Sequence, residues 1–456
     1  MNTTLWHEIE KFDFDFPLSE YSFSTRLAYE NYWTEAYTKK AIEEYKKFMF
    51  LAATSGVMVS PSEIVDIVWH QHLIFTESYS DFCKILGKQI NHIPSTHKKE
   101  ENEIFSLARK RTKELYEQNF GEQPKEFWEH SSIDQIFDLK ASKYNFQLSL
   151  IYGVLGIFIF TGFNVLFLRK TFIAINNPYF LIVLIGLFVI SIILLNIFNN
   201  KKLDDILNKI KGNFIIQNLS SKELVFMDYN QLKFVIHGYV NYMIVSKNLK
   251  AGKNETIEFV DDDLETNDII ANIVLNTVKE HGSINYKLLL DNLLSKPILN
   301  CVSRSVLSIK DVVEKSTSFM KLFIINLCVL GFFISLALSR IIIGLTRGKQ
   351  IILLLVTTII IVVISYIFLT VLKNKMTSSL IPNYYKKQII SKNKSEYSSW
   401  NWNYFLLGTS LLSVTFLEMA KNYMHVNNNN QYSSCGSSCS SCGSSCGSGC
   451  GGCGGD

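Results

Sequence analysis

The sequence predicts a mainly α-helical membrane protein with a cytosolic helical domain, two transmembrane helical hairpins flanking a small, mostly helical domain, and a disordered tail. Three observations predict this fold class. Four apolar runs have the length needed to cross a bilayer. The residues before them repeat apolar side chains at helical spacing, and the C-terminal residues show no periodicity. A hydrophobic content of 48% agrees with a membrane protein.

These patterns divide the chain into consecutive segments. They are a helical domain (1–130), a linker (131–147), a first transmembrane hairpin (148–198), a mostly helical middle domain (199–321), a second transmembrane hairpin (322–372), a juxtamembrane segment (373–430) and a tail rich in Cys, Gly and Ser (431–456). The first residues are acidic and lack a basic start followed by an apolar run, so they do not resemble a signal peptide.

The first domain begins with a predicted helix over Tyr21–Ala53, whose aromatic residues recur at helical spacing. The inward positions of this helix are Trp33, Tyr37, Ala41, Tyr45 and Phe48. Such a stripe is typical of a packed core rather than of a cofactor site. A charged amphipathic helix is predicted from Lys98 to Asn119, with a solvated polar face.

The stretch from Ser60 to Pro94 carries the clearest helix signals of the soluble region. Ser60, Pro61 and Glu63 form a capping box with proline at the first helical position. Gly87 supplies a left-handed stop. The pattern therefore predicts one continuous helix between Ser60 and Gly87.

Three histidines in this stretch are candidates for metal binding. On a straight helix His72 lies in the apolar face, whereas His70 lies on a separate stripe with Asp66, so the two imidazoles point in nearly opposite directions. His72 is then a hydrogen-bonded core residue, and His70 a solvated partner of Asp66. The alternative is that His92 folds back on His70 with Asp66 or Glu77 and completes a zinc or iron site.

The same stretch resembles the core motif of the glycine-rich domain-containing protein-like family. The matching pattern is V-D-x-x-W-H-x-H-L, then Y-x-x-F-C, L-G and N-H-x-P. It is carried here by Val65, Asp66, Trp69, His70, His72, Leu73, Tyr79, Phe82, Cys83, Leu86, Gly87, Asn91, His92 and Pro94. The resemblance covers about residues 5–130, and it implies a helical domain without implying a particular reaction.

The apolar runs of spanning length are Leu148–Leu168, Tyr179–Phe198, Leu322–Leu338 and Ile351–Leu372. None contains a charged residue, which disfavours a transporter. Besides hydroxyls, their main polar side chains are Asn164, Asn196, Asn326 and Cys328, which are expected to serve helix packing.

A long hydrophilic N-terminal region without a signal peptide is expected to stay in the cytosol, and four spans return the middle domain and the tail to that side. This arrangement suits a bacterial inner-membrane protein. The apolar segment Tyr404–Phe416 is short, so we expect it to be interfacial or packed; if it spans, the tail lies outside.

The middle domain opens with a second capping box at Ser220 and Glu223. A short strand is predicted over Glu255–Val260, and helices over Asn267–Glu280 and Tyr286–Leu294. This order is compatible with a winged-helix-like module. It shows no basic recognition face, so we expect protein association or self-association rather than DNA binding.

The tail has Gly, Ser and Asn in proportions that cannot bury a core, which predicts disorder. Its cysteines recur every three or four residues, at Cys435, Cys439, Cys442, Cys446, Cys450 and Cys453. Flexible neighbours let such thiolates converge on a soft metal, here Zn or Cu. The alternatives are incidental cysteines in a low-complexity tail, redox exchange, and acylation that anchors the tail to the bilayer.

A second resemblance covers about residues 140–456. Two membrane hairpins around a domain with L-S-S-K-E-L (Leu219–Leu224) and a Gly/Cys-rich end are similar to a group of bacterial multi-pass membrane proteins. This likeness rests on layout and implies no reaction.

The function predicted from these patterns is non-enzymatic metal binding by a multi-pass membrane protein, through the tail and through His70, His92 and Asp66. The alternative is a membrane scaffold that binds protein partners. A metallohydrolase with His70 and His92 on one metal ranks third, and no nucleophile elbow, phosphate loop or dinucleotide fingerprint indicates another chemistry. The lipid bilayer is the expected partner, and a net charge of +4 argues against nucleic acid.

Overall fold

The computed structural model describes residues 2–16, 19–92, 99–144, 146–261, 268–392, 395–424 and 453–454. The chain forms two compact units, each assembled from separate stretches of sequence. The first unit contains Met1–Ile136, Gln217–Val306 and Ile390–Asp456, and the second contains Phe137–Ile216 and Leu307–Ile389. The described residues are mainly helical, as the sequence predicted.

The N-terminal part of the first unit is a set of helices around α3. Its elements are α1 (Thr3–Lys11), α2 (Phe23–Asn31), α3 (Glu35–Thr54), α4 (Glu63–Ile74), α5 (Thr76–Leu86), β1 (Asn91–His92), α6 (Lys99–Phe120), α7 (Lys125–Trp128) and α8 (Ile133–Ile136). Every residue of the predicted aromatic stripe is buried. The prediction of one helix over Tyr21–Ala53 is wrong, because Tyr32 adopts a left-handed conformation and Thr34 caps a new helix.

The prediction of one helix between Ser60 and Gly87 is also wrong at two points. The N-cap is Ser62 rather than Ser60, since the Ser62 hydroxyl accepts a hydrogen bond from the backbone N–H of Val65. The helix is interrupted at Phe75, where φ is −88° and ψ is 66°, and α5 starts directly afterwards. Gly87 ends α5 in the left-handed conformation, as expected.

The middle stretch of the first unit mixes helices with a small sheet. Its elements are α13 (Ser221–Tyr229), α14 (Lys233–Val245), β2 (Leu249–Ala251), β3 (Thr256–Phe259), α15 (Ile269–His281), β4 (Ser283–Asn285), α16 (Tyr286–Leu294) and α17 (Pro297–Lys315), the last of which ends in the second unit. The three strands pair antiparallel in the order β2-β3-β4. Residues 404–416 pack against this stretch: the Tyr404 hydroxyl donates to the Phe234 carbonyl at 2.9 Å.

That packed segment belongs to α21 (Trp400–Leu407), η3 (Gly408–Leu411) and α22 (Val414–Met424). Gly408 has a positive φ of 60°, and a Cβ there would lie 2.3 Å from the Tyr229 hydroxyl, so this turn requires glycine. The described part of the tail is β5 (Cys453–Gly454), which pairs antiparallel with β1.

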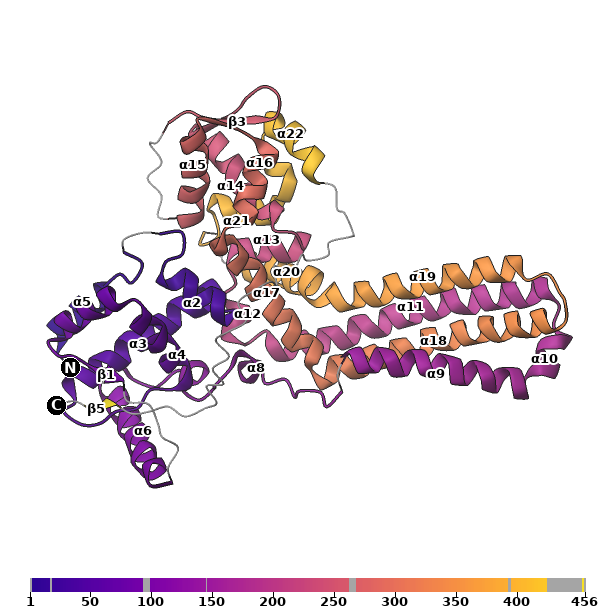
Figure 1. The fold of residues 1–456 in the computed structure, drawn as a ribbon, viewed down its shortest axis with the longest axis horizontal. Coiled ribbons are helices and arrows are strands. Elements are labelled where there is room, and N and C mark those ends of the chain that lie inside the picture. Colours follow the sequence, from indigo (N-terminus) through magenta and orange to yellow (C-terminus); the bar gives the residue numbers. More distant parts are fainter. Residues whose placement is uncertain are drawn as a thin grey trace. The chain divides into compact units, whose positions relative to one another are not determined.

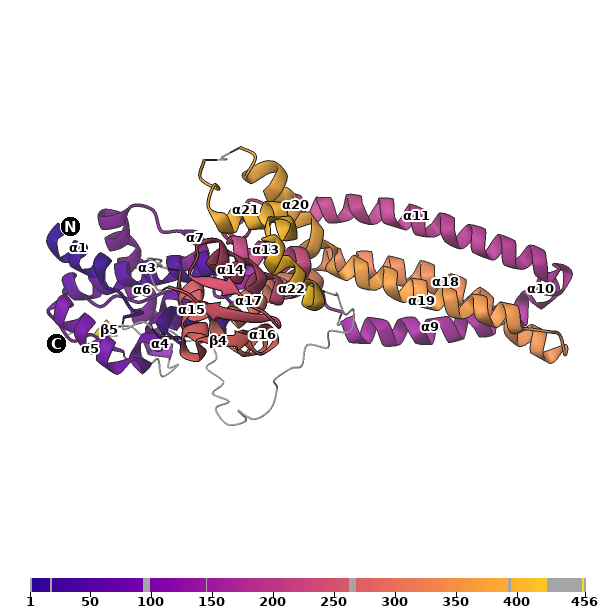
Figure 2. The same cartoon turned by 90° about the horizontal axis from the view of Figure 1, so that it is seen from above.

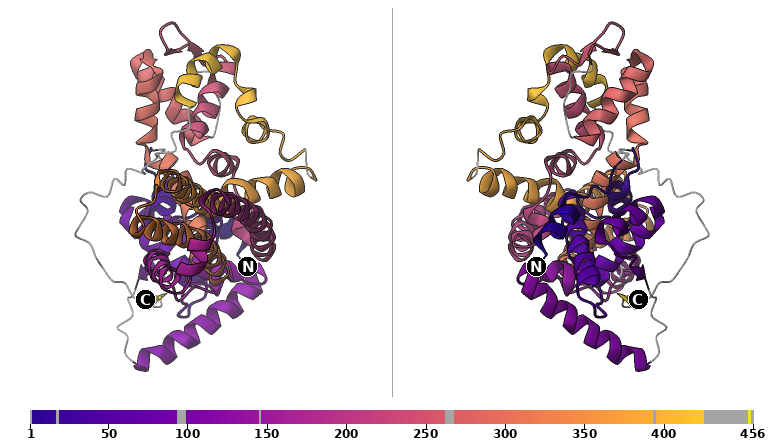
Figure 3. Two further views of the ribbon diagram at one scale, coloured as in Figure 1. Left: turned by 90° about the vertical axis from the view of Figure 1, so that its right-hand side faces the viewer. Right: turned by 90° about the vertical axis from the view of Figure 1, so that its left-hand side faces the viewer.

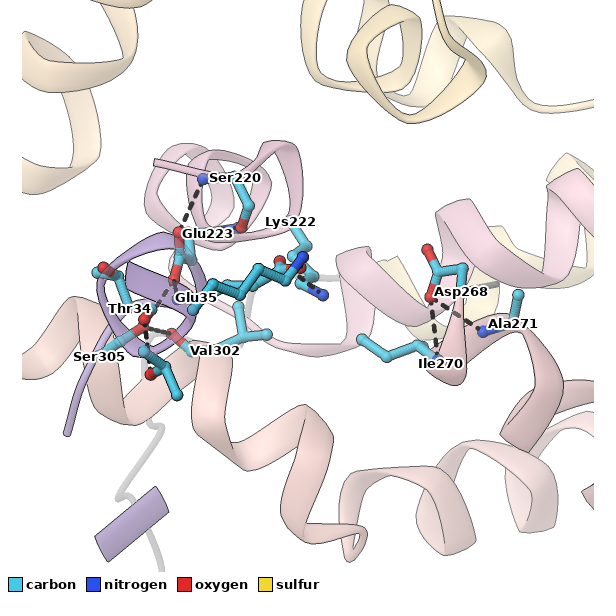
Figure 4. A network of polar contacts seen from close by, with 12 residues as sticks. Thr34, Glu35, Ser220, Lys222, Glu223, Asp268, Ile270, Ala271, Val302 and Ser305 are labelled. Carbon is cyan, nitrogen blue, oxygen red and sulfur yellow. Dashed lines mark hydrogen bonds and ion pairs between the residues drawn. The ribbon is translucent and has the colours of Figure 1, made fainter. Parts of the chain in front are cut away.

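Glu223 joins the N-terminal and middle stretches within the first unit (Figure 4). It closes the predicted capping box with Ser220. Its carboxylate also accepts from the first amide of α3, Glu35, at 3.1 Å, and from the Ser305 hydroxyl of α17 at 3.3 Å. Beside it, the Lys222 ammonium lies 3.0 Å from the Glu35 carboxylate. One buried carboxylate therefore caps two helices that are far apart in sequence.

The second unit contains four long apolar helices that run alongside one another (Figures 1 and 2) and are seen end-on in the left view of Figure 3. They are α9 (Phe146–Phe167), α11 (Asn177–Ile210), α18 (Thr317–Thr346) and α19 (Ile352–Lys375). Shorter elements are α10 (Arg169–Ala174), α12 (Phe214–Gln217), η1 (Met376–Leu380), α20 (Ile381–Tyr384) and η2 (Tyr385–Ile389). The described residues hold four helices long and apolar enough to cross a membrane, which is compatible with the predicted membrane protein.

Two asparagines hold α11 and α18 together. Asn199 and Asn326 exchange side-chain hydrogen bonds of 2.9 and 2.8 Å, and both are buried. Helix packing was the role expected of Asn326. Its partner lies one residue past the predicted end of the second apolar run.

Candidate metal centre

Two neighbouring elements bring three potential ligands together. Asp66 and His70 lie four residues apart on α4, so their side chains share one face of that helix. The chain turns at Phe75, α5 packs against α4, and Gly87 then ends α5. The short strand β1 follows and carries His92 back to the exposed face of α4.

The three side chains meet closely enough to share one ion. A ligand atom from each of Asp66, His70 and His92 lies within 4.8 Å of the other two. One carboxylate oxygen of Asp66 lies 3.1 Å from His70 Nδ1, and the other lies 3.0 Å from His92 Nε2. The two imidazole centroids are 4.4 Å apart. Glu77, the alternative carboxylate, is exposed and is not part of this cluster.

Burial is uneven across the cluster. The side chains of Asp66 and His92 are 15% and 10% exposed, whereas that of His70 is 56% exposed. Protein atoms therefore surround Asp66 and His92, whereas His70 borders solvent.

At this site the pKa of Asp66 is lowered and the pKa of His70 is raised, so both shifts favour the charged forms. Burial alone would raise the pKa of Asp66, but its hydrogen bonds to His70 and His92 outweigh burial and lower that pKa. The hydrogen bond to the Asp66 carboxylate raises the pKa of His70. Asp66 is therefore an anion near neutral pH, as a metal ligand must be.

A hydrogen-bonded chain supports the strand that carries His92. Trp69 Nε1 donates to the Tyr79 hydroxyl at 3.2 Å, and Tyr79 donates in turn to the carbonyl of Ile90. The Trp69 ring also contacts the His92 imidazole, with centroids 4.5 Å apart. Trp69 and Tyr79 were not predicted to act at the site, although both belong to the motif that defines this stretch. A cavity of about 320 Å³ lies beside His92, lined in part by Thr76, Ser80 and Gln89.

His72 lies in the core, as its place in the apolar face indicated. It is fully buried, and its two ring nitrogens contact the hydroxyls of Tyr45 at 2.9 Å and Ser78 at 3.2 Å. Burial lowers its pKa to about 3, so the ring is neutral. Both nitrogens are engaged, and the residue has no free position for a metal.

The tail cysteines fall mostly outside the described residues. This applies to Cys435, Cys439, Cys442, Cys446 and Cys450, whose proposed metal binding remains a prediction. Cys453 belongs to β5, and only its backbone is described.

The protein is therefore a helical one, with four candidate membrane spans in the second unit and a cluster of one carboxylate and two imidazoles in the first. Residues 9–114 match a family model described as UCP032817-like. The match covers less than half of the chain, but it includes Asp66, His70 and His92. No curated protein and no solved structure matches the chain.

Proposed function

We propose that this is a multi-pass membrane protein that binds a metal ion through Asp66, His70 and His92, with the thiols of the tail as a second source of ligands. The convergence of three ligand atoms within 4.8 Å carries the proposal. These residues come from two elements that are separated by a helix, so their meeting is not a consequence of helical spacing alone.

The ligand set suggests a borderline divalent ion. Two imidazoles and one carboxylate are ligands of zinc and of non-haem iron, both of which tolerate further ligands at open positions. The tail thiols favour softer ions, Zn or Cu. Zinc suits both the Asp66–His70–His92 ligands and the tail thiols, so we propose it as the bound metal.

The membrane context is part of the proposal. The four apolar helices support association with a lipid bilayer. We assign the protein to a bacterial inner membrane, with the first unit in the cytosol, where reducing conditions keep thiols free. The resemblance of the N-terminal region to the glycine-rich domain-containing protein-like family does not suggest a reaction for this protein.

Metal analysis of the purified full chain tests the proposal. We expect about one zinc per chain at the Asp66–His70–His92 centre, with additional metal on the tail. Deleting residues 432–456 should remove the additional metal only, and His92→Ala should empty the centre. Matched metal contents in the full chain, the His92→Ala variant and the truncated chain would contradict metal binding and leave a membrane scaffold for protein partners.

A control variant separates the centre from other histidines. His7 lies on α1 and its side chain is 64% exposed, with Glu10 at 3.9 Å. His7→Ala removes one imidazole without touching the cluster, so its zinc content should equal that of the unchanged chain.

A further inference from the structure

The second unit has a mostly apolar groove along the outside of α9 and α18, which run side by side (Figures 1 and 2). Its volume is about 480 Å³. The two helices touch within it, because a Cβ at Gly153 would lie 2.4 Å from a side-chain carbon of Leu327, whereas a Cβ at Gly156 would meet no atom within 4 Å. The absence of a side chain at Gly156 therefore leaves space in the groove. Other lining residues are Tyr152 and Phe160 of α9 and Ile324, Cys328 and Phe332 of α18.

The groove follows the helix axes for about the depth of one bilayer leaflet. On α9 its lining extends from Ser149 to Phe160, which is about 17 Å at the rise of 1.5 Å per residue. The hydrocarbon core of a bilayer is about 30 Å thick, so each leaflet supplies about 15 Å. At the far end the rings of Phe160 and Phe332 approach with centroids 5.8 Å apart. The length and the lining therefore match one extended acyl chain of a single leaflet.

The near end of the groove carries positive charge. The backbone N–H of Ser142 donates to the carbonyl of Lys315 at 2.8 Å, so the segments that lead into α9 and α18 lie side by side. Lys143 is exposed and directly precedes Tyr144, which lines the groove. Lys321 is also exposed, and it shares a helical face with a lining residue of α18 three positions further on. Two ammonium groups therefore border the end at which both helices begin.

We propose that this groove binds an acyl chain of an anionic phospholipid, whose phosphate contacts the ammonium groups of Lys143 and Lys321. The inference rests on the membrane part of the proposed function and is independent of the metal centre. Each basic side chain at a membrane surface strengthens the attraction of anionic lipid by about fivefold. A second copy packed on the same face would bring like charges together, whereas an anionic headgroup neutralises them.

Photo-crosslinking of the purified full chain in lipid nanodiscs tests the inference. The probes are phosphatidylglycerol and phosphatidylcholine with the same diazirine-bearing acyl chain, and mass spectrometry locates the labelled residues. The anionic probe should label the groove at least about fivefold more than the neutral probe. Gly156→Leu fills the open space without displacing a neighbour, so it should remove most of this labelling. Gly162→Leu is the matched control, because its Cβ also meets no atom within 4 Å and Gly162 does not line the groove.

Substitution of the two lysines tests the headgroup separately from the acyl chain. Lys143→Gln combined with Lys321→Gln removes the charge and keeps the groove, so the two probes should then label it equally. Lys349 is exposed and follows the opposite end of α18, so Lys349→Gln should keep the preference for the anionic probe.

The outcomes separate this inference from the proposed function. Equal labelling by both probes in the unchanged chain, or groove labelling that survives Gly156→Leu, overturns the lipid site and leaves the membrane placement intact. A preference that survives the double lysine variant does the same. An unlabelled groove in a chain that forms dimers assigns this face to a second copy. Absence of lipid labelling on all four long helices overturns the membrane placement as well, while the zinc content of the same chain reports on the metal centre.

Discussion

Two buried or half-buried carboxylates of the first unit show what separates a structural polar cluster from a candidate metal centre. Glu223 is 2% exposed and accepts hydrogen bonds from backbone amides and hydroxyls. Asp66 is surrounded by two imidazoles. Amides and hydroxyls at helix ends are fixed donors, so an ion at Glu223 would uncap two helices. Imidazoles that release a proton become ligands with little movement.

Converging polar groups therefore do not by themselves indicate ion binding. The two clusters differ in the type of group that contacts the carboxylate and in the access of that carboxylate to solvent. Glu223 is sealed and its oxygens are occupied, whereas the Asp66 cluster opens to solvent at His70, which is 56% exposed. We therefore expect substitutions at Glu223 to change stability without changing metal content, and substitutions at Asp66 to do the reverse.

The largest expected effect is the loss of stability in Glu223→Ala. The change leaves the backbone amides of Glu35 and Ser220 without their acceptor, at a cost of about 3 kcal/mol. The melting temperature of the full chain in detergent should fall by about 6 °C or more. Metal content should stay the same.

Two further variants sharpen this result. Glu223→Gln keeps an acceptor oxygen for one of the two amides but turns a donor NH2 group towards the other, so it should cost about 2 kcal/mol, less than Glu223→Ala. Glu280 on α15 is exposed, and Glu280→Ala should leave the melting temperature unchanged. A Glu223→Ala chain that loses zinc while keeping its melting temperature would reverse the assignment of the two clusters.

Next in size is the loss of metal affinity in Asp66→Asn. A neutral amide keeps the shape of Asp66 but removes the charge that the ion needs, so zinc affinity should fall by at least about tenfold to a hundredfold. The metal-free melting temperature should change by less than about 2 °C. Competition with a zinc-binding dye measures the affinity.

The matched control for Asp66 is Asp81 on α5. It is 54% exposed and pairs with Lys84 at 2.8 Å, as a surface carboxylate commonly does. Asp81→Asn should bind zinc as the unchanged chain does. Equal affinities in both variants would remove Asp66 from the centre.

A smaller effect is expected at the ion pair beside Glu223. The Lys222 ammonium, with Lys39, lowers the pKa of Glu35 to about 2, although burial opposes the shift. A carboxyl group with a lowered pKa stabilises the fold above its ordinary pKa of 4.5, and this stability is lost as the pH falls towards 2. Lys222→Met should cost about 1–2 kcal/mol at pH 7 and flatten the loss of stability over that acid range.

Lys39 provides the comparison for Lys222, because both contact the same carboxylate. Lys39 Nζ lies 2.7 Å from Glu35 but its side chain is 73% exposed, and an exposed pair contributes little. Lys39→Met should therefore change the melting temperature by less than about 2 °C. Thermal unfolding from pH 7 to pH 3 measures both variants, and an unaltered pH profile in Lys222→Met would contradict the assignment.

The smallest expected effect is a loss of zinc affinity when a hydroxyl that supports the strand of His92 is removed. Tyr79→Phe removes the hydroxyl that links Trp69 to the Ile90 carbonyl, two residues before His92. Zinc affinity should fall by about three- to tenfold, since groups that orient a ligand affect binding less than the ligand itself. Tyr116→Phe is a matched loss of a buried hydroxyl elsewhere in the same unit, and it should leave zinc affinity unchanged.

The parts of the fold that the sequence predicted are those governed by local pattern. The four long apolar helices follow from length and hydropathy. The capping box at Ser220 and the stop at Gly87 follow from side-chain and backbone preferences within a few residues. The buried aromatic stripe of α3 follows from helical spacing.

The parts that the sequence did not predict depend on contacts between distant residues. Nothing near Phe75 marks a break, because the apolar spacing continues from His72 through Phe75 to Tyr79. Ser60 and Ser62 are both plausible caps. Ser62 is favoured since its hydroxyl donates to the Phe127 carbonyl at 2.6 Å, whereas the Ser60 amide is engaged by Thr112.

The candidate site was predicted in its members but not in its geometry. Asp66 and His70 share a helical face, which the spacing indicates. The return of His92 requires the break at Phe75, the packing of α5 on α4 and the anchor of Tyr79 on Ile90. Each of these features depends on contacts between different elements. The sequence therefore predicted His92 at the site only as an alternative.

An anomalous difference map of zinc-loaded crystals would show where the chain binds the ion. Data collected above and below the zinc absorption edge locate the ion without reference to any variant. We expect a peak among the Asp66 carboxylate and the imidazoles of His70 and His92, at about 2.0–2.2 Å from each ligand atom. A fully occupied zinc elsewhere in the chain, with this cluster empty, would contradict it.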